Sequence, residues 1–312
     1  MGPNLSTHPT VTIVVPTKNC AESIGALLTS IQNQSYRDFE TIVVDSSDDE
    51  TSNIASSYNV SIIRCVPKGL TMARNLGIKN GSGEIVCFTD GDCTMELDWL
   101  HLIVTEFQKD SKIGCVGGSV LSNEDSFLGR YCSEALIPAY PVYYQPSIIA
   151  DPALAELHFG GVRFPVGCNL AFKREALNEV GGFNEKWLST WDEFEILTRL
   201  LNKGFAISIN PEIVVYHKPR KSILEATRQA YTYGQGFGTF SRMYRNSHPR
   251  NRLLSTLIEA TKTISHSVGL FKKSSRFSVF VYPIIDMLLG FSYYAGFAVG
   301  YTKDQNQQDS IR

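Results

Sequence analysis

The sequence predicts an α/β protein in which an open, largely parallel sheet precedes a helical C-terminal extension that associates with a membrane. The first observation is that short β-branched, apolar runs alternate with helix-like segments over residues 11–118. The second is an apolar run at residues 277–301, which is long enough as a helix to cross the hydrocarbon layer of a bilayer. Together they predict a catalytic or binding domain with a membrane-directed appendage.

The composition is that of an ordinary folded protein. The chain has 312 residues, 19% of them charged, and its net charge of −2 argues against a nucleic-acid partner. Its seven cysteines form no Cys-x-x-Cys pair, which fits reduced thiols better than a disulfide framework or a zinc site. The N-terminus lacks the basic head and apolar core of a signal peptide.

The N-terminal elements follow one another in strand–helix–strand order. Strands are expected at 11–15, 39–44, 61–64 and 84–88, with helices at 21–32, 71–79 and 95–107 and a further strand at 113–118. This spacing is typical of right-handed βαβ units, whose parallel strands bind ligands at their carboxyl ends. We therefore look for functional side chains just after each strand.

Polar residues gather at that edge of the predicted sheet. Pro16, Thr17 and Asn19 follow the first strand, Asp45 ends the second, and Asp90 and Asp92 follow the fourth in the run Thr89-Asp90-Gly91-Asp92. Two carboxylates at a strand end can hold Mg²⁺ or Mn²⁺ together with a substrate's phosphates. A polar turn is the alternative explanation for an Asp-Gly-Asp run.

Five short motifs in sequence carry a family resemblance. They lie at residues 14–19, 42–47, 73–77, 81–84 and 88–92, and their order resembles the nucleotide-sugar half of a family 2 glycosyltransferase of the GT-A fold. The resemblance spans about residues 10–220. It implies a Rossmann-like open mixed sheet with helices on both faces, divided into a nucleotide-sugar half at 11–118 and an acceptor half at 119–220.

The resemblance also implies roles for the polar residues. Asp45 would accept the imide hydrogen of a uracil ring, against a wall formed by Pro16, Thr17 and Asn19. Arg74 would reach the diphosphate, Asp90 would face the ribose or the metal, and Asp92 would ligate Mn²⁺ or Mg²⁺ between the phosphates. The alternatives are a helix-capping or turn role for Asp45 and a surface ion pair for Arg74.

The acceptor half contains the expected base. Residues 164–174 resemble the strand that enters this half, and residues 180–185 resemble the turn before the catalytic helix. The family's usual Glu-Asp-x-Asp is here Asp192-Glu193-x-Glu195, so Glu193 or its neighbour Asp192 would deprotonate the acceptor hydroxyl in an inverting displacement. Helix-dipole stabilisation is the alternative role of these acids. The Tyr- and Pro-rich segment at 119–163 is either an acceptor-facing insertion or a packed surface excursion.

His217 ends a strand expected at 214–218 and is a candidate third metal ligand, with capping or packing as the alternative. Residues 226–240 resemble a flexible segment that follows the core of lipid-linked-sugar enzymes. The Gln-x-x-Arg-Trp signature of processive synthases is absent from the sequence, which favours the transfer of one sugar per encounter.

The tail predicts contact with a membrane. The run at 277–301 is interrupted by Pro283 and Asp286 and is preceded by Lys272, Lys273 and Arg276, a bias that would keep the catalytic half in the cytoplasm. The run either spans the bilayer, lies on its cytoplasmic face, or forms a buried or re-entrant helix pair broken at Pro283. Residues 253–271 are expected to form an interfacial helix.

The domain organisation follows from these segments. We expect a disordered N-terminus at 1–10, a catalytic domain at 11–220, a helical extension at 221–302 and a polar tail at 303–312. The expected activity is an inverting transfer of one sugar from a nucleoside diphosphate sugar, with UDP favoured, to a glycan or polyprenyl-linked acceptor. The alternatives are a nucleotidyltransferase acting on a sugar phosphate and a non-catalytic protein that binds sugar nucleotides.

Overall fold

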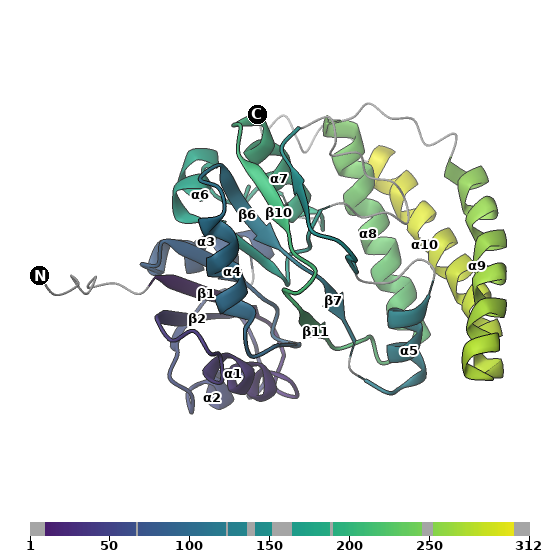
Figure 1. The fold of residues 1–312 in the computed structure, drawn as a ribbon, viewed down its shortest axis with the longest axis horizontal. Helices are drawn as coiled ribbons and strands as arrows, with labels where there is room; N and C mark the ends of the chain where they lie inside the picture. Colours follow the sequence, from purple (N-terminus) through teal and green to yellow (C-terminus); the bar gives the residue numbers. More distant parts are fainter. Residues whose placement is uncertain are drawn as a thin grey trace, which may run out of the picture. The chain divides into compact units, whose positions relative to one another are not determined.

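The structure is a computed structural model that describes residues 10–66, 68–122, 124–135, 141–151, 164–187, 190–244 and 252–302. The chain divides into two units (Figure 1). Unit 1 comprises residues 1–121, 141–185 and 193–218, and unit 2 comprises residues 122–140, 186–192 and 219–312. The expectations for the two termini, and for much of the 119–163 segment, lie outside the described residues.

Unit 1 is built on an eight-stranded mixed sheet with the order β3-β2-β1-β4-β9-β6-β10-β8. Its strands are β1 (Val11–Thr17), β2 (Phe39–Asp45), β3 (Ser61–Arg64), β4 (Ile85–Phe88), β6 (Ile113–Gly117), β8 (Ser147–Ile149), β9 (Leu170–Lys173) and β10 (Ala206–Ile209). The neighbours β3, β2, β1 and β4 are parallel, whereas β9 runs antiparallel to both β4 and β6. The mixed sheet is the one that the family resemblance implies.

The core of unit 1 lies around β1 and β4, whose apolar side chains are buried. Its helices are α1 (Ile24–Gln32), α2 (Thr51–Ala55), α3 (Leu70–Asn80), α4 (Trp99–Gln108), α6 (Arg174–Val180) and α7 (Asp192–Asn202), of which the first residue, Asp192, is assigned to unit 2. Helix α3 approaches β1 so closely that a Cβ at Gly77 would lie 2.2 Å from the Val14 side chain. Fully buried parallel strands explain why their sequences are continuous apolar runs instead of alternating ones.

A second, three-stranded sheet has the order β5-β11-β7, formed by β5 (Cys93–Met95), β11 (Val215–His217) and β7 (Val120–Leu121). The sequence predicted a helix from residue 95, but Met95 pairs with Val215 in the ladder and α4 begins only at Trp99. A three-residue strand is too short to leave a periodic signal in the sequence. Strands β8 and β10 were likewise not predicted.

A buried carboxylate joins α4 to the end of β10. Glu106 accepts hydrogen bonds from the Ser208 hydroxyl (2.8 Å), the Asn210 amide (3.1 Å) and Lys109 (2.6 Å). Burial alone would raise the pKa of Glu106, but the hydrogen bonds from Lys109, Ser208 and Asn210 outweigh it and lower the pKa below 4.5.

Unit 2 is helical. It contains α5 (Phe127–Glu134), α8 (Ile223–Tyr244), α9 (Arg252–Ser274), the 3₁₀ helix η3 (Phe277–Val281) and α10 (Tyr282–Thr302). Residues 226–240, which resemble a flexible segment in the sequence, lie within the regular helix α8. Pro283 falls in the first turn of α10, where its missing N–H costs no hydrogen bond, so the apolar run is a short 3₁₀ turn followed by one helix.

Helices α8 and α10 pack backbone against backbone through glycines. A Cβ at Gly234 would lie 1.9 Å from the Tyr293 carbonyl oxygen, and one at Gly296 would lie 1.9 Å from the Tyr231 carbonyl oxygen. At Gly300 the corresponding distance to Gln235 is 2.0 Å. The Gly296-x-x-x-Gly300 pair, a weak packing motif in the sequence, thus contacts α8 directly.

Asp286, the charged residue in the apolar run, has a partner inside unit 2. The Tyr131 hydroxyl of α5 donates a 2.6 Å hydrogen bond to the Asp286 carboxylate. Around this pair, buried apolar side chains of α5, η3 and α10 form a common cluster, namely Tyr131, Ala135, Val279, Tyr282 and Ile285. The carboxylate therefore marks the side of α10 that packs on the protein.

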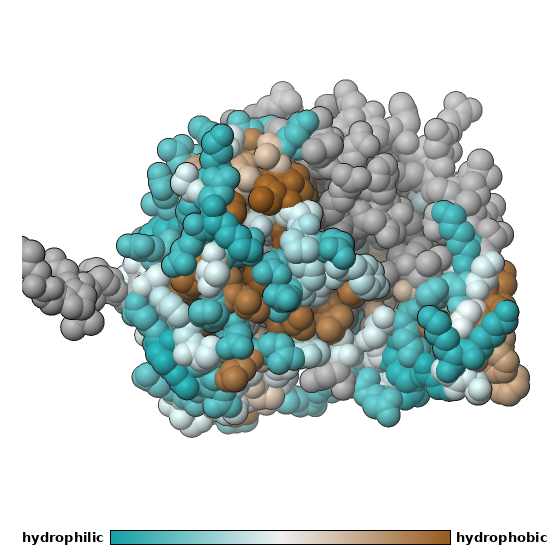
Figure 2. Space-filling view, in the orientation of Figure 1, coloured by the Kyte–Doolittle hydropathy of each residue, from teal (hydrophilic) through white to brown (hydrophobic). Residues whose placement is uncertain are grey.

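Other side chains of these helices are apolar and exposed. On η3 and α10 they recur at helical spacing and include Phe277, Phe280, Val281, Ile284, Leu288 and Phe291; we call these six residues the outer face of α10. On α9, Ile264 and Val268 are exposed, and Figure 2 shows a hydrophobic edge beside a hydrophilic face at the position of this helix. Within the described residues, Phe277–Thr302 is the stretch long and apolar enough to cross a membrane.

Candidate active site

The carboxyl ends of β1, β2 and β4 bring the expected polar residues of unit 1 to one sheet edge. The parallel register pairs Thr17 with Asp45, and β4 ends two residues before Asp90. These positions follow from the strand alternation alone, because parallel neighbours must end on the same side.

Asp45 is buried and its carboxylate is held by the chain itself. The Thr17 hydroxyl donates to Oδ1 (2.8 Å), and the Ser47 hydroxyl donates to the same oxygen (2.5 Å). Arg64, which pairs with Asp45 in the β2–β3 register, donates to Oδ2. The Arg64 side chain is 55% exposed, and its Nη2 also donates to the Ser47 carbonyl (2.8 Å), so this arginine bridges the Asp45 carboxylate and the loop after β2.

The loop after β1 is fixed to the loop after β2. Asn19 adopts a left-handed backbone conformation (φ 55°), donates its N–H to the Ser47 hydroxyl (2.7 Å) and accepts from the Asp48 N–H (3.0 Å). Pro16 is half-buried and Thr17 is buried. The residues expected to form the nucleoside wall are therefore pre-ordered around Asp45.

The Asp-Gly-Asp turn is held from two sides. A Cβ at Gly91 would lie 2.7 Å from the Cys20 sulfur, so a larger residue there would displace the Cys20 side chain. The Ser23 hydroxyl donates to the Gly91 carbonyl (2.8 Å). On the other side, the Lys218 N–H donates to the Asp92 carbonyl (3.0 Å).

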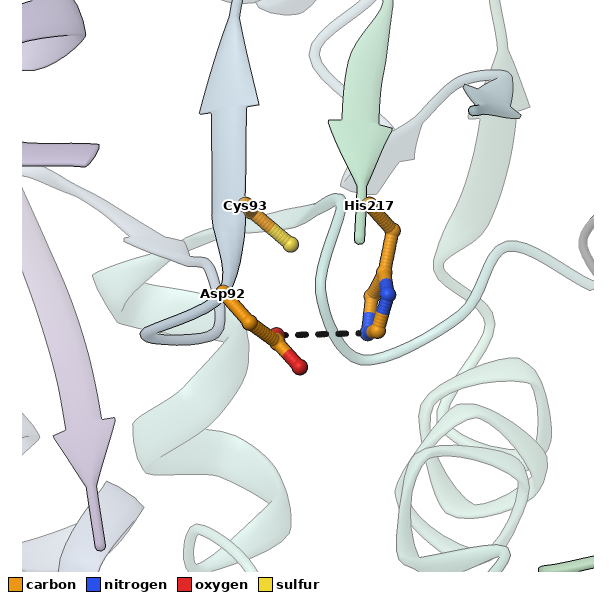
Figure 3. A group of neighbouring side chains, drawn as sticks. All are labelled: Asp92, Cys93 and His217. Atoms are coloured by element: carbon orange, nitrogen blue, oxygen red, sulfur yellow. Dashed lines mark ion pairs between the residues drawn. The ribbon is translucent and has the colours of Figure 1, made fainter. Parts of the chain in front are cut away.

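Asp92, Cys93 and His217 direct their side chains toward one another (Figure 3). The antiparallel register places His217 directly opposite Cys93, and the His217 Nε2 lies 3.3 Å from the Asp92 Oδ1. Their ligand atoms all lie within 4.8 Å of one another. This is the strand pairing that the sequence did not predict, and it brings the late histidine to the Asp-Gly-Asp turn.

The hydrogen bonding of His217 limits which group can lie between its imidazole and the Asp92 carboxylate. Its Nδ1 lies 2.8 Å from the Lys218 carbonyl, which can only accept, so Nδ1 carries a proton. In the neutral ring, Nε2 then presents a lone pair toward a carboxylate that also only accepts. Two facing acceptors require a proton or a cation between them, and a metal-binding histidine typically donates its other N–H to a carbonyl. The donor set therefore fits a divalent metal.

Glu193 belongs to the same neighbourhood. The neighbouring Cys93 lowers the pKa of the Cys168 thiol, but burial raises it and so do the charges of Asp90, Asp92 and Glu193, so the pKa is raised overall. One thiol thus lies near all three acids. Asp192 is buried at the start of α7.

Glu195 has a structural role. Arg199 donates to both of its oxygens (2.9 and 2.6 Å) and also to the Val180 and Gly182 carbonyls. The pair therefore fixes the turn before α7, and the acids available for proton transfer in this segment are Asp192 and Glu193.

Arg74 is buried between aromatic rings. Its guanidinium lies 5.1 Å from the ring centroid of Phe183 and 6.0 Å from that of Phe88, and a Cβ at Gly167 would lie 2.1 Å from its Nη2. It is therefore not the surface ion pair weighed as an alternative.

Sequence reasoning missed two residues of the site. For Arg64, the one sequence feature that pointed to the site was its position at the end of β3. For Cys93, it was its position directly after the Asp-Gly-Asp turn. Both acquire their partners through strand register, which no single segment encodes.

Comparisons with known proteins show the family of the chain and its fold. The family model for glycosyl transferase family 2 matches residues 12–181. Glycosyltransferase AglE of Haloferax volcanii is 26% identical over 243 residues, or 74% of each chain. A glucosyl-dolichyl phosphate glucuronosyltransferase of the same organism is 22% identical over 297 residues, covering 88% of this chain and 91% of the relative.

Among solved structures, mannosyltransferase PcManGT from Pyrobaculum calidifontis, in complex with GDP-Man and Mn²⁺, aligns with a TM-score of 0.61 at 19% identity. The alignment covers 96% of this chain and 89% of that one. At this identity the likeness shows a shared fold.

Proposed function

Because the chain belongs to glycosyl transferase family 2, it is a glycosyltransferase with a sugar-nucleotide donor, and we propose that it moves one sugar, with inversion, to a glycan hydroxyl. The donor is a nucleoside diphosphate sugar, with UDP favoured, and the acceptor is a lipid-linked or cell-surface glycan. The approach of Asp92 and His217 at one sheet edge carries this proposal. The alternatives of a nucleotidyltransferase and a non-catalytic binding protein are not favoured by the family match.

Asp92 and His217 hold Mn²⁺ or Mg²⁺, and Asp90 faces the metal or the donor ribose. The facing acceptors at 3.3 Å support this assignment. A bound divalent cation offsets the charge that develops on the departing nucleoside diphosphate. The PcManGT complex, which contains Mn²⁺, supports the choice of metal.

Asp45 recognises the base, and Pro16, Thr17 and Asn19 line the nucleoside. For Asp45 to accept an imide hydrogen, Arg64 must release Oδ2, and because its side chain is 55% exposed it can do so by breaking one further hydrogen bond, to the Ser47 carbonyl (2.8 Å). The hydrogen bonds of Thr17 and Ser47 to Oδ1 keep the carboxylate oriented during that exchange. Arg74 acts on the diphosphate from its place beside Phe183.

Glu193 takes the proton of the acceptor hydroxyl, with Asp192 as its neighbour in this role. A base must lie across the reacting carbon from the leaving group, and the shared effect of Asp90, Asp92 and Glu193 on Cys168 supports their common neighbourhood. Glu195 is committed to Arg199 and does not compete for this task.

The acceptor is presented at a membrane. The printed name of one relative, a glucosyl-dolichyl phosphate glucuronosyltransferase, supports a lipid-linked acceptor. The outer face of α10, with the basic residues Lys272, Lys273 and Arg276 just before it, supports docking on the cytoplasmic face, where nucleotide sugars are made.

The test is a donor panel. Purified protein with Mn²⁺ is incubated with UDP- and GDP-sugars and lipid extracts, and free nucleoside diphosphate and labelled lipid are measured. Glu193→Gln and Asp192→Asn are compared with Glu212→Gln, a control in the loop before β11. We expect transfer to fall sharply in Glu193→Gln and to persist in the control; equal transfer in both would remove Glu193 from the mechanism.

A further inference from the structure

We infer that Asp92, Cys93 and His217 form a thiolate-containing site that takes Zn²⁺ in place of Mn²⁺ and thereby inhibits sugar transfer. The existence of the zinc site rests on the geometry alone, whereas the inhibition rests on the proposed function. Zinc would then act as a regulatory ion on the centre that another cation activates.

Two of the three donor atoms have the spacing of ligands on a small tetrahedral ion, and the third lies close by. Two ligands on tetrahedral zinc, with bonds of about 2.0–2.1 Å, lie roughly 3.3 Å apart. The Asp92 Oδ1 and His217 Nε2 are separated by 3.3 Å, and the Cys93 Sγ lies within 4.8 Å of both. Figure 3 shows the Cys93 sulfur directed into the space between the Asp92 and His217 side chains.

The sulfur of Cys93 distinguishes Zn²⁺ from Mn²⁺ and Mg²⁺. Mn²⁺ and Mg²⁺ prefer oxygen ligands and take them from carboxylates, water and phosphates, whereas a thiolate selects zinc. Binding through Cys93 would add a sulfur ligand that Mn²⁺ and Mg²⁺ do not favour. The same turn can therefore hold an activating hard cation with substrate, or an inhibiting softer cation without it.

A second sulfur supports the inference. The Cys93 and Cys168 side chains are both buried, and burial together with the neighbouring Cys168 thiol raises the pKa of the Cys93 thiol. A buried sulfur pair next to a carboxylate and an imidazole offers the Cys/His chemistry of zinc centres. On zinc binding, the Cys93 S–H bond breaks, the proton passes to solvent and a Zn–S bond forms, so no oxidant is required.

The opposing explanation is that Cys93 and Cys168 are small apolar residues of the core. In that case their thiols stay protonated, and the bound ion is coordinated only by Asp92 and His217 among these side chains. The two explanations differ in one observable, which is a metal–sulfur bond.

Cobalt, a spectroscopic stand-in for zinc, tests for that bond without substrate. The intact protein is titrated with Co²⁺, and the near-ultraviolet thiolate-to-cobalt charge-transfer band is recorded in wild type, Cys93→Ser and Cys93→Ala. Cys132→Ser, which changes a thiol of α5 in unit 2, is the control. We expect one equivalent of cobalt to produce the band in wild type and control, zinc to abolish it, and both Cys93 variants to lack it.

A wild-type protein without the band, or Cys93 variants that retain it, would overturn the inference. If the Cys93 variants do not fold by circular dichroism, zinc-edge X-ray absorption on wild type still decides. We expect a Zn–S distance of about 2.3 Å, and a first shell of oxygen and nitrogen alone would contradict the site.

Inhibition is measured separately. Zinc is added to Mn²⁺-dependent donor hydrolysis, and each variant is scored against its own zinc-free rate. We expect Cys93→Ala to need about ten times more zinc than wild type for half-inhibition, or more, because a ligand is lost. Equal sensitivity would contradict the inhibitory role. If wild type hydrolyses no donor, the proposed function fails, while the cobalt spectrum still decides the zinc site.

Discussion

The sheet edge of unit 1 and the helices of unit 2 are held in place by different forces. At the sheet edge, hydrogen bonds from Thr17, Ser47 and Arg64 orient a buried carboxylate, and strand register sets His217 opposite Cys93. In unit 2, glycines bring the backbones of α8 and α10 together, and apolar side chains are left exposed on the other side. Directional hydrogen bonds therefore orient the polar side chains of the candidate active site, whereas close helix packing leaves an exposed apolar face on unit 2.

The largest effect is expected at the sheet edge. Asp92→Asn keeps the shape of the side chain but removes a charge that faces His217, so Mn²⁺-dependent donor hydrolysis should fall by about 10²–10³-fold, the usual loss for one electrostatic stabiliser. Steady-state rates with a UDP- or GDP-sugar measure it. Asp110→Asn, a change in the loop between α4 and β6, is the control. A loss of similar size in this variant would show that the effect is not specific to the charge that faces His217.

Next in size is the glycine contact of unit 2. Gly234→Leu would drive its Cβ into the Tyr293 carbonyl, and we expect a loss of about 3 kcal/mol in unfolding free energy, at the upper end of ordinary overpacking. Denaturant unfolding followed by circular dichroism measures it. Gly269→Ala on α9 is the matched control, because no atom lies within 4 Å of that Cβ, and it should stabilise by about 0.5–1 kcal/mol. Tolerance of leucine at 234 would show that the helices are not packed through glycine.

A smaller effect, with a pH signature, is expected in the core of unit 1. The folded protein holds the pKa of Glu106 below its unfolded value of 4.5, so the ionised carboxylate contributes stability above that pH and loses it as the pH falls through the folded pKa. Glu106→Gln should cost about 1–2 kcal/mol at neutral pH, and the difference from wild type should shrink below about pH 4.5. Unfolding measured from pH 3 to about pH 7 gives the curve, and a difference independent of pH would exclude the carboxylate as its source.

The smallest effect is expected on the outer face of α10. Phe291 is 50% exposed, so Phe291→Ser should weaken binding to anionic vesicles by about tenfold, which corresponds to burying roughly half of a phenylalanine side chain. Co-sedimentation measures the binding. Tyr144→Ser removes an aromatic side chain of unit 1 that is 85% exposed, and it should leave vesicle binding unchanged. If the two variants behave alike, the outer face does not distinguish unit 2 as the docking surface.

The sequence predicted those parts of the fold that are written in consecutive residues. Buried parallel strands are apolar runs, so β1, β2, β3 and β4 were expected within one or two residues of their bounds, and their ends located the polar site. The expected start of α4 was wrong because the ladder between Met95 and Val215 replaces a helical turn with a strand.

Contacts between distant segments could not be predicted in this way. Asp286 interrupts the apolar run in the sequence, but its partner Tyr131 lies 155 residues away in the chain, so the sequence could not identify the pair. The ion pair of Arg64 with Asp45, and the place of Cys93 beside His217, likewise depend on register between strands. Such pairs are set by tertiary structure, and no local pattern of charge or hydropathy records them.

Manganese binding at the Asp-Gly-Asp turn is the most direct test of Asp92 and His217 as metal ligands. The electron paramagnetic resonance signal of free Mn²⁺ is titrated with protein in the presence of UDP or GDP, using wild type, Asp92→Asn and His217→Ala. We predict that wild type binds one equivalent of manganese together with the nucleotide and that both variants bind much more weakly. Unchanged manganese binding in either variant would contradict the assignment of Asp92 and His217 as the metal ligands of this glycosyltransferase.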